Sequence, residues 1–217
     1  MTTLLRFPRG VYGITPEWAD TQRLLAAIEA AADGGMAALQ WRRKTGTLRE
    51  RQRQARALAK LCKKRGILFI INDDWRLAAE LDADGVHLGR EDGQLAEARL
   101  GLGSGKIVGC SCYNDPALAQ QALAADVDYI AFGALYPSSI KPEAVRATLE
   151  HIRIGRALAE GKTRAGARVA VVAIGGLTAD NAAPVIQAGA DSIALISGLF
   201  GGSRIRATAA RCDELFR

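Results

Sequence analysis

Acidic side chains follow two consecutive apolar stretches of the sequence. Phe69–Asp74 begins with β-branched and aromatic residues and ends in an amide, Asn72, and two carboxylates. Gly85–Asp92 repeats the pattern, and short apolar runs of this kind are typical of strands buried on both faces. If the two strands are parallel neighbours, Asp73 and Asp92 face one pocket, where their oxygens suit Mg²⁺ and a phosphate-rich substrate completes the coordination. The alternative is that acids at strand ends are loop residues or helix caps.

Polar and basic residues follow an earlier strand-like stretch of the chain. Because side chains alternate along an extended backbone, Gln40, Arg42 and Lys44 project to the same side. Two neighbouring cations suit an anion that carries several oxygens. Ser111 and Lys141 follow later strands and add a hydroxyl and a third cation. The alternative is a set of exposed basic residues after an edge strand.

The elements that must position these residues alternate strictly along the chain. We predict strands over residues 11–15, 37–42, 69–72, 85–89, 106–111, 129–133, 169–175 and 192–197. We predict helices over residues 21–34, 48–65, 75–81, 94–100, 116–125, 143–160, 181–188 and 204–216, with a loop over residues 161–168. Eight such units indicate a single-domain (β/α)8 TIM barrel spanning residues 1–217, whose active site lies at the carboxyl ends of the strands. A doubly wound open sheet shares the alternation, but no Gly-rich dinucleotide fingerprint follows the first strand.

Turns that contain glycine follow the last two predicted strands. Gly175–Leu177 and Ile196–Gly198 lie where many barrels bind a phosphate through backbone N–H groups. Together with the cations described above, these turns predict two anion positions. A diphosphate leaving group at the cations and a monophosphate acceptor at the glycine turns match this distribution of charge.

Composition narrows the class of protein. No stretch approaches the roughly 18 apolar residues of a membrane span, and residues 1–9 lack the apolar region of a signal peptide, so we expect a cytoplasmic protein with no membrane partner. The net charge is +6. Because the basic residues are spread over predicted helices without interleaved aromatic residues, we expect no nucleic-acid partner. We expect a solvated basic face that attracts small anionic substrates.

Cysteine and histidine form no motif with metal-site spacing. Cys62, Cys110, Cys112 and Cys212 lack C-x-x-C spacing, so buried thiols are favoured over a metal or redox site. His87 lies inside a predicted strand, and we expect it to be a core histidine with satisfied hydrogen bonds.

These motifs, in this order, make the chain similar to the thiamine-phosphate synthase family. The matching segments cover nearly the whole chain: Tyr12–Thr15, Gln40-x-Arg42-x-Lys44, Ile71–Asp73, Asp84–Asp92, Gly109-x-Ser111, Lys141, Ala173–Gly176 and Ile196–Ser197. The D-G-V-H-L-G-x-E-D and Q-x-R-x-K blocks are the specific ones. The resemblance implies a Mg²⁺-dependent transferase. Its substrates are 4-amino-5-hydroxymethyl-2-methylpyrimidine diphosphate and 4-methyl-5-(2-phosphoethyl)thiazole, and its products are thiamine phosphate and diphosphate.

The resemblance also implies a role for each matching residue. Asp73 and Asp92 hold Mg²⁺ against the diphosphate, and Gln40 contacts the pyrimidine. The diphosphate is bound by Arg42, Lys44, Asn72, Ser111 and Lys141. All of these except Asn72 also assist its departure. The residues that seat the thiazole phosphate are Gly176, Ile196 and Ser197. In the family the C–O bond to diphosphate breaks first, and the thiazole nitrogen captures the resulting pyrimidine methyl cation. Such a step needs the charge of the leaving group to be neutralised more than it needs a general base.

The segment after the sixth predicted strand departs from the family pattern. The usual G-P-x-F-P-T-x-T-K is read here as Gly133–Lys141. Ser138 keeps a substrate-binding hydroxyl where threonine is usual, whereas Ile140 has none. Arg90 and Tyr113 also replace residues that are common in the family. These differences concern substrate contacts rather than the fold.

Two other functions stay open at this point. A thiazole tautomerase-like paralogue resembles the synthase but relaxes the diphosphate site, which this sequence retains. A non-catalytic phosphate-ligand-binding barrel is the other, and Ile140 is the residue that favours it. Ligand binding without product formation from both substrates selects that second alternative. The sequence leaves the oligomeric state open, including a homo-oligomer.

Overall fold

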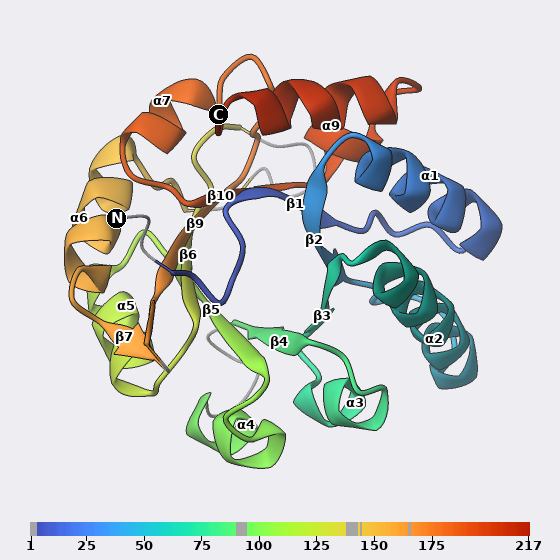
Figure 1. Ribbon diagram of the computed structural model, residues 1–217, viewed down its shortest axis with the longest axis horizontal. Helices are drawn as coiled ribbons and strands as arrows, with labels where there is room; N and C mark the ends of the chain where they lie inside the picture. The colour runs from blue at the N-terminus through green and yellow to red at the C-terminus, as the bar shows by residue number, and fades with distance from the viewer. Residues whose placement is uncertain (1–3, 90–94, 138–142, 144, 165) are drawn as a thin grey trace.

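The computed structural model describes residues 4–89, 95–137, 143, 145–164 and 166–217. At its centre, parallel strands form a closed barrel in the order β1-β10-β9-β6-β5-β4-β3-β2, seen along its axis in Figure 1. The strands are β1 (Gly10–Ile14), β2 (Met36–Trp41), β3 (Leu68–Asn72), β4 (Gly85–Leu88), β5 (Ile107–Tyr113), β6 (Tyr129–Phe132), β9 (Ala170–Ile174) and β10 (Ser192–Leu195). The predicted (β/α)8 barrel is confirmed.

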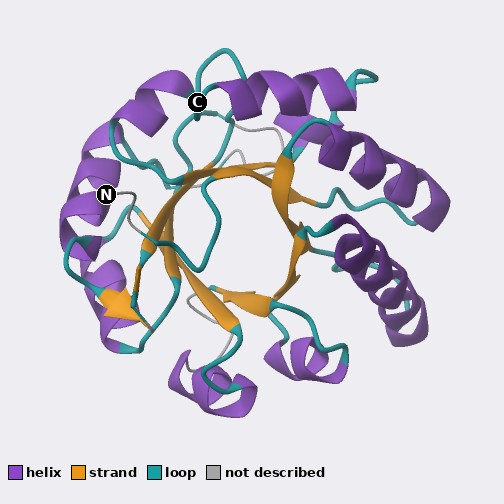
Figure 2. Cartoon of the chain, in the orientation of Figure 1, coloured by secondary structure: helices purple, strands orange, loops and turns teal. Residues whose placement is uncertain are grey.

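Helices surround the barrel on its outside (Figure 2). In the described ranges they are α1 (Thr21–Asp33), α2 (Leu48–Arg65), α3 (Trp75–Glu80), α4 (Leu95–Leu102), α5 (Pro116–Ala124), α6 (Leu149–Ala159), α7 (Ala183–Gln187), α8 (Ser197–Phe200) and α9 (Ile205–Glu214). Helix α2 matches its predicted range at both ends, because local signals define both. The Thr47 hydroxyl accepts the N–H of Glu50, and Gly66 ends the helix at φ 66°. Within those ranges, no helix has the length and apolar character needed to cross a membrane.

Helix α6 begins later than the sequence predicts. Its first residue is Leu149 rather than residue 143. The N–H of Ala134 donates to the carbonyl of Val145 at 3.1 Å, and the N–H of Ala147 donates to the carbonyl of Ala134 at 2.9 Å. These bonds to the segment after β6 replace the bonds that a helix would make within itself. The predicted start is therefore wrong.

Three short elements after α6 differ from the sequence prediction. The predicted loop over residues 161–168 contains an antiparallel pair, β7 (Thr163–Arg164) and β8 (Ala167–Arg168). Its two arginines are buried, and each forms an ion pair with an aspartate of the barrel. Helix α8 begins at Ser197, the last residue of the predicted eighth strand, so that strand ends earlier than predicted, at Leu195. Tertiary contacts rather than local sequence explain the pair.

Two apolar layers stabilise the barrel, one beneath the helices and one inside the strands. Tyr12, Ile70, Tyr129 and Val172 belong to the interior layer. Phe7, from the segment before β1, joins it, with its ring centroid 4.2 Å from that of Tyr129 and 4.9 Å from that of Tyr12. In Figure 1 this segment crosses the opening of the barrel on its way to β1. It therefore closes the end at which the strands begin.

At that same end, an aspartate precedes each of three strands that alternate around the barrel. Asp84, Asp128 and Asp191 come directly before β4, β6 and β10. Their carboxylates accept backbone N–H groups of the neighbouring strands at 2.7 to 2.9 Å, from Phe69, Val108 and Val171 respectively. Each side chain thus bonds a strand to its neighbour, so Asp84, which the sequence presented only as part of a motif, has a structural role.

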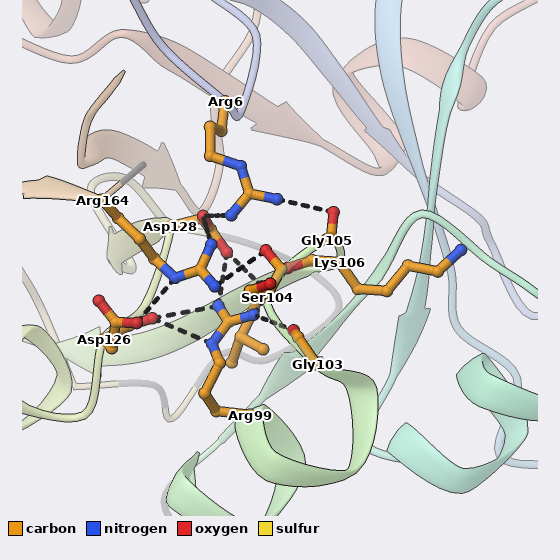
Figure 3. A network of polar contacts seen from close by, with 10 residues as sticks. Arg6, Arg99, Gly103, Ser104, Gly105, Lys106, Asp126, Asp128 and Arg164 are labelled. Atoms are coloured by element: carbon orange, nitrogen blue, oxygen red, sulfur yellow. Dashed lines mark hydrogen bonds and ion pairs between the residues drawn. The ribbon is translucent and has the colours of Figure 1, made fainter. Parts of the chain in front are cut away.

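Arginines surround the buried Asp128 carboxylate (Figure 3). Arg6 lies 2.8 Å away, Arg99 2.6 Å and Arg164 3.1 Å, and they come from the segment before β1, from α4 and from β7. A carboxylate can be buried only when charged or polar partners replace water. This cluster therefore ties distant segments to the base of the barrel.

Candidate active site

The predicted site residues that the structure describes lie at the opposite end, where the strands finish. Gln40 is in β2, Asn72 ends β3, and Ser111 lies in β5. Strand pairing places Asn72 beside His87 and Gln40 beside Ile70. Side chains from β2 to β5 are thereby gathered at one rim of the barrel, as the fold requires of an active site.

Glu17 organises the two cations that follow β2. Its carboxylate accepts from the Arg42 guanidinium at 3.2 Å and from the backbone N–H of Lys44 at 3.1 Å. The Thr15 hydroxyl also accepts the N–H of Arg42 at 2.8 Å. Arg42 therefore carries a carboxylate partner in the structure, and an anionic ligand must share or replace it. The sequence prediction did not include Glu17, although an acid two residues beyond the first predicted strand was a signal for it.

Asp73 and Lys44 meet at the rim. One Asp73 carboxylate oxygen lies 3.7 Å from the Lys44 ammonium, and 32% of the Asp73 side chain is exposed. The backbone of Asp73 is left-handed, with φ 66°, and its N–H donates to the carbonyl of His87 at 2.8 Å. Non-glycine residues seldom adopt this conformation, and those that do often belong to functional sites. Lys44, Asn72 and Asp73 all line a cavity of about 320 Å³ between the β2 and β3 loops.

The neighbouring acid, Asp74, has a different role. Its carboxylate accepts the N–H of Leu77 at 2.9 Å and caps helix α3. For Asp74, the interpretation of a strand-end acid as a helix cap is therefore confirmed. Asp73 makes no such cap and keeps a partly exposed carboxylate beside a cation, which fits a Mg²⁺ ion that shares its oxygens with an anionic substrate. Among the residues with described positions, no cluster of three or more acidic, histidine or cysteine side chains suits a metal ion.

A chain of hydrogen bonds crosses the barrel interior beneath this rim. The Gln40 amide donates to the Tyr12 hydroxyl at 2.7 Å, and the Tyr12 and Tyr129 hydroxyls are 3.0 Å apart. His87 Nδ1 lies 2.8 Å from the Tyr129 hydroxyl, and His87 Nε2 lies 2.8 Å from the Ser111 hydroxyl. Both ring nitrogens of His87 are thus hydrogen-bonded, as expected, although the side chain is half-buried rather than part of the core. The prediction missed both tyrosines, which connect two residues that it did include.

Burial determines the ionisation of the two tyrosines. It raises the pKa of the Tyr12 hydroxyl well above 10.0, against a smaller lowering by its hydrogen bonds to Tyr129 and Gln40. Burial also raises the pKa of the Tyr129 hydroxyl, with further contributions from Tyr12. Both side chains are therefore neutral phenols that carry one hydroxyl hydrogen each.

The loops after β6, β9 and β10 pack closely against one another. Gly176 has φ 64°, and a Cβ atom there would lie 2.4 Å from the carbonyl oxygen of Pro137. A Cβ atom on Gly198 would lie 2.0 Å from the carbonyl oxygen of Leu177. Asn181 donates to the carbonyl of Gly176 at 3.0 Å and fixes that turn. Glycine is therefore required at both positions, and the structure brings the predicted phosphate-seating segments, Gly176 and residues 196–197, together.

Some predicted positions lie outside the described residues. They are Asp92, Ser138 and Lys141, together with the atypical Arg90 and Ile140. A larger hollow of about 690 Å³ between α1 and α9 is lined by other residues, among them Trp18 and Arg23. The smaller cavity is the one lined by Lys44, Asn72 and Asp73, which the sequence predicts as site residues.

Comparison with known proteins gives consistent results. Residues 11–199 match the family model described as thiamine monophosphate synthase. The chain is 53% identical over 216 residues to a thiamine-phosphate synthase of Bordetella pertussis, covering 98% of this chain and 97% of that one. It is 50% identical to a thiamine-phosphate synthase of Thiobacillus denitrificans, with coverage of 97% and 96%. A solved thiamine phosphate pyrophosphorylase from Pyrococcus furiosus matches with a TM-score of 0.81 at 30% identity, over 97% of this chain and 96% of that chain.

Proposed function

Because this chain belongs to the thiamine monophosphate synthase family, we propose that it joins 4-amino-5-hydroxymethyl-2-methylpyrimidine diphosphate to 4-methyl-5-(2-phosphoethyl)thiazole. The products are thiamine phosphate and diphosphate. The observation that carries this proposal is the meeting of Lys44 and Asp73 at 3.7 Å in a cavity at the carboxyl ends of the strands. A cation and a carboxylate in contact supply one group for a diphosphate and one for its metal ion.

The diphosphate binds to the residues that follow β2, β3 and β5. Arg42 and Lys44 bind its oxygens as cations, while Asn72 and Ser111 add neutral hydrogen bonds. Diphosphate entry moves Arg42 from its 3.2 Å contact with Glu17 towards the ligand. Arg42 can make this exchange at low cost, because a partly exposed ion pair contributes about 0 to 1 kcal/mol. Lys141 adds a further cation.

These residues assist the departure of diphosphate. The C–O bond breaks with its electron pair going to the diphosphate, and the thiazole nitrogen then forms the new C–N bond to the methylene carbon. Cations and hydrogen-bond donors stabilise the negative charge as it develops on the leaving group. Asp73 and Asp92 would hold Mg²⁺, which when bound neutralises further diphosphate charge. Gln40 holds the pyrimidine.

The thiazole phosphate binds at Gly176 and the Ile196–Ser197 turn, and Ser138, which follows Pro137 in the sequence, adds a substrate-binding hydroxyl. The close packing of Gly176 against Pro137, and of Gly198 against Leu177, supports a position there for a phosphate held by backbone groups. Two small-molecule substrates thus occupy two anion positions, one at each side of the rim.

Turnover with both purified substrates and Mg²⁺ tests the proposal. Thiamine phosphate should form only when both substrates are present. Its formation should stop when a chelator is added and resume when Mg²⁺ is added back. Binding of both ligands without product would overturn the synthase and select a non-catalytic ligand-binding barrel. Isomerisation of a thiazole substrate without any need for the pyrimidine would select the tautomerase.

A further inference from the structure

The series of hydrogen bonds that runs from Gln40 through Tyr12, Tyr129 and His87 to Ser111 has one consistent arrangement of hydrogens. Gln40 donates from its amide nitrogen to Tyr12, so the Tyr12 hydroxyl gives its own hydrogen to its other partner, Tyr129. Tyr129 then gives its hydrogen to Nδ1 of His87, because each neutral phenol has only one. A neutral imidazole whose Nδ1 accepts carries its hydrogen on Nε2, and this hydrogen points to the Ser111 oxygen. The Ser111 hydroxyl hydrogen is left for a group outside this series of hydrogen bonds, such as a ligand.

The charge of the proposed ligand selects the same arrangement. Diphosphate oxygens are anionic and accept hydrogen bonds without donating them. In the opposite arrangement Ser111 would donate to His87 and present only lone pairs to that anion. The observed direction at Gln40 and the requirement at Ser111 therefore agree, although they come from opposite ends of the chain.

We propose, resting on the function proposed above, that Tyr129 and His87 are positioning residues that make Ser111 a hydrogen-bond donor to the departing diphosphate. At the other end, Gln40 uses an N–H for Tyr12, which leaves its carbonyl oxygen as the acceptor for the pyrimidine amino group. The two ends of one substrate are thus recognised by one series of hydrogen-bonded side chains inside the barrel. Neither tyrosine nor the histidine transfers a proton in the reaction.

The tautomer of His87 is the direct test, and it needs no turnover. The chain contains two histidines, so long-range ¹H–¹⁵N spectra of protein labelled in histidine contain two ring systems, and His151→Gln assigns them. We expect the Nε2–H tautomer for His87 in the wild type. Tyr129→Phe keeps the ring but removes the donor to Nδ1, and it should shift His87 towards a mixture of tautomers. An Nδ1–H tautomer in the wild type would overturn the proposal even if the enzyme makes thiamine phosphate.

Kinetics provide the second test. Tyr129→Phe and His87→Leu should each raise KM for the pyrimidine diphosphate or lower kcat by about tenfold or more, the loss of one hydrogen bond to a charged group. The KM for the thiazole phosphate should not change. His87→Gln, which restores an N–H donor towards Ser111, should recover part of the loss. Equal effects of His87→Leu and His87→Gln would overturn the positioning role.

A matched control and a binding assay separate this inference from the proposed function. Ser192→Ala removes another buried hydroxyl, which donates to the Gly10 carbonyl at 2.8 Å at the opposite end of the barrel, and should change neither kinetics nor the His87 spectrum. If the wild type makes no thiamine phosphate, calorimetry with inorganic diphosphate and Mg²⁺ decides. Weaker binding by Ser111→Ala and Tyr129→Phe, but not by Ser192→Ala, supports the inference, and equal binding by all overturns it.

Discussion

At the scale of single residues, Asp73 and Asp74 show how two adjacent acids acquire different functions. The Asp74 carboxylate accepts the N–H of Leu77, whereas Asp73 has a left-handed backbone and a partly exposed carboxylate beside Lys44. Asp74 is therefore a helix cap, as the alternative interpretation predicts, whereas Asp73 has the exposure and the neighbouring cation that the proposed metal role requires. Sequence alone did not separate the two, because the difference lies in one backbone angle.

This pair makes a matched experiment. Asp73→Ala should lower Mg²⁺-dependent turnover by about 100-fold or more, because the Mg²⁺ that neutralises the diphosphate loses one of its protein ligands. The fold should remain intact. Asp74→Ala should cost about 1 kcal/mol of stability through loss of a helix cap, with the Mg²⁺ dependence unchanged. Turnover against Mg²⁺ concentration and thermal unfolding measure both effects. Unchanged activity in Asp73→Ala would remove the metal role.

At the scale of elements, the agreement between sequence and structure follows the range of the interactions. The buried strands and both ends of α2 were predictable, because apolar runs, Thr47 and Gly66 act within a few residues. The pairing of Tyr12 with Tyr129 joins positions 117 residues apart, and no local pattern announces it. The late start of α6 likewise depends on bonds to Ala134. Lys44, Asn72 and Asp73 were predictable as neighbours because strand ends in a barrel share one rim.

The packed glycine loops permit a prediction at this scale. Gly176→Ala places a methyl group 2.4 Å from the Pro137 carbonyl oxygen, so the loops must move apart. We expect KM for the thiazole phosphate to rise by about tenfold, with little change for the pyrimidine diphosphate. Gly103→Ala is the control, because it has a similar positive φ of 73° with nothing within 4 Å, and it should change stability alone. Equal kinetics for both variants would contradict a phosphate position at Gly176.

At the scale of the whole molecule, the two ends of the barrel have different tasks. Asp128 and Asp191, at the end where the strands begin, are buried and paired with arginines, whereas Arg42, Lys44 and Asp73 at the other rim are partly or largely exposed. In (β/α)8 barrels, the first end usually serves stability and the second chemistry. The division is visible here in the surroundings of individual charges.

Asp128 is the residue on which this stability should depend most. Asp128→Asn leaves three arginines without their shared anion, and breaking buried ion pairs of this kind costs about 3 to 5 kcal/mol. Urea unfolding should show the loss. Asp82→Asn, which removes an exposed partner of Lys106, is the control and should leave the unfolding midpoint unchanged. A small effect at Asp128 would mean that water readily replaces its carboxylate.

Alkaline pH should destabilise the protein through its buried thiols and phenols. Burial raises the pKa of Cys62 from 9.0 to about 12 and that of Cys212 to about 11, and it raises the pKa of both interior tyrosines. The unfolded chain therefore loses these protons first, so stability is full below a pH of about 9 and falls as pH rises towards the folded-state values. Urea unfolding between pH 8 and pH 11, in steps of about 0.5, measures the slope. Tyr12→Phe should make it shallower above pH 10.

Phe7 has a consequence for the order of events during turnover. Because its ring seals the floor of the barrel against Tyr12 and Tyr129, small molecules must arrive and depart through the opposite mouth. The product diphosphate then occupies the binding site of the next pyrimidine diphosphate until it leaves through the same opening. Added diphosphate should accordingly inhibit competitively against the pyrimidine substrate in steady-state kinetics, whereas a noncompetitive pattern would show that the two ligands do not exclude each other from one site.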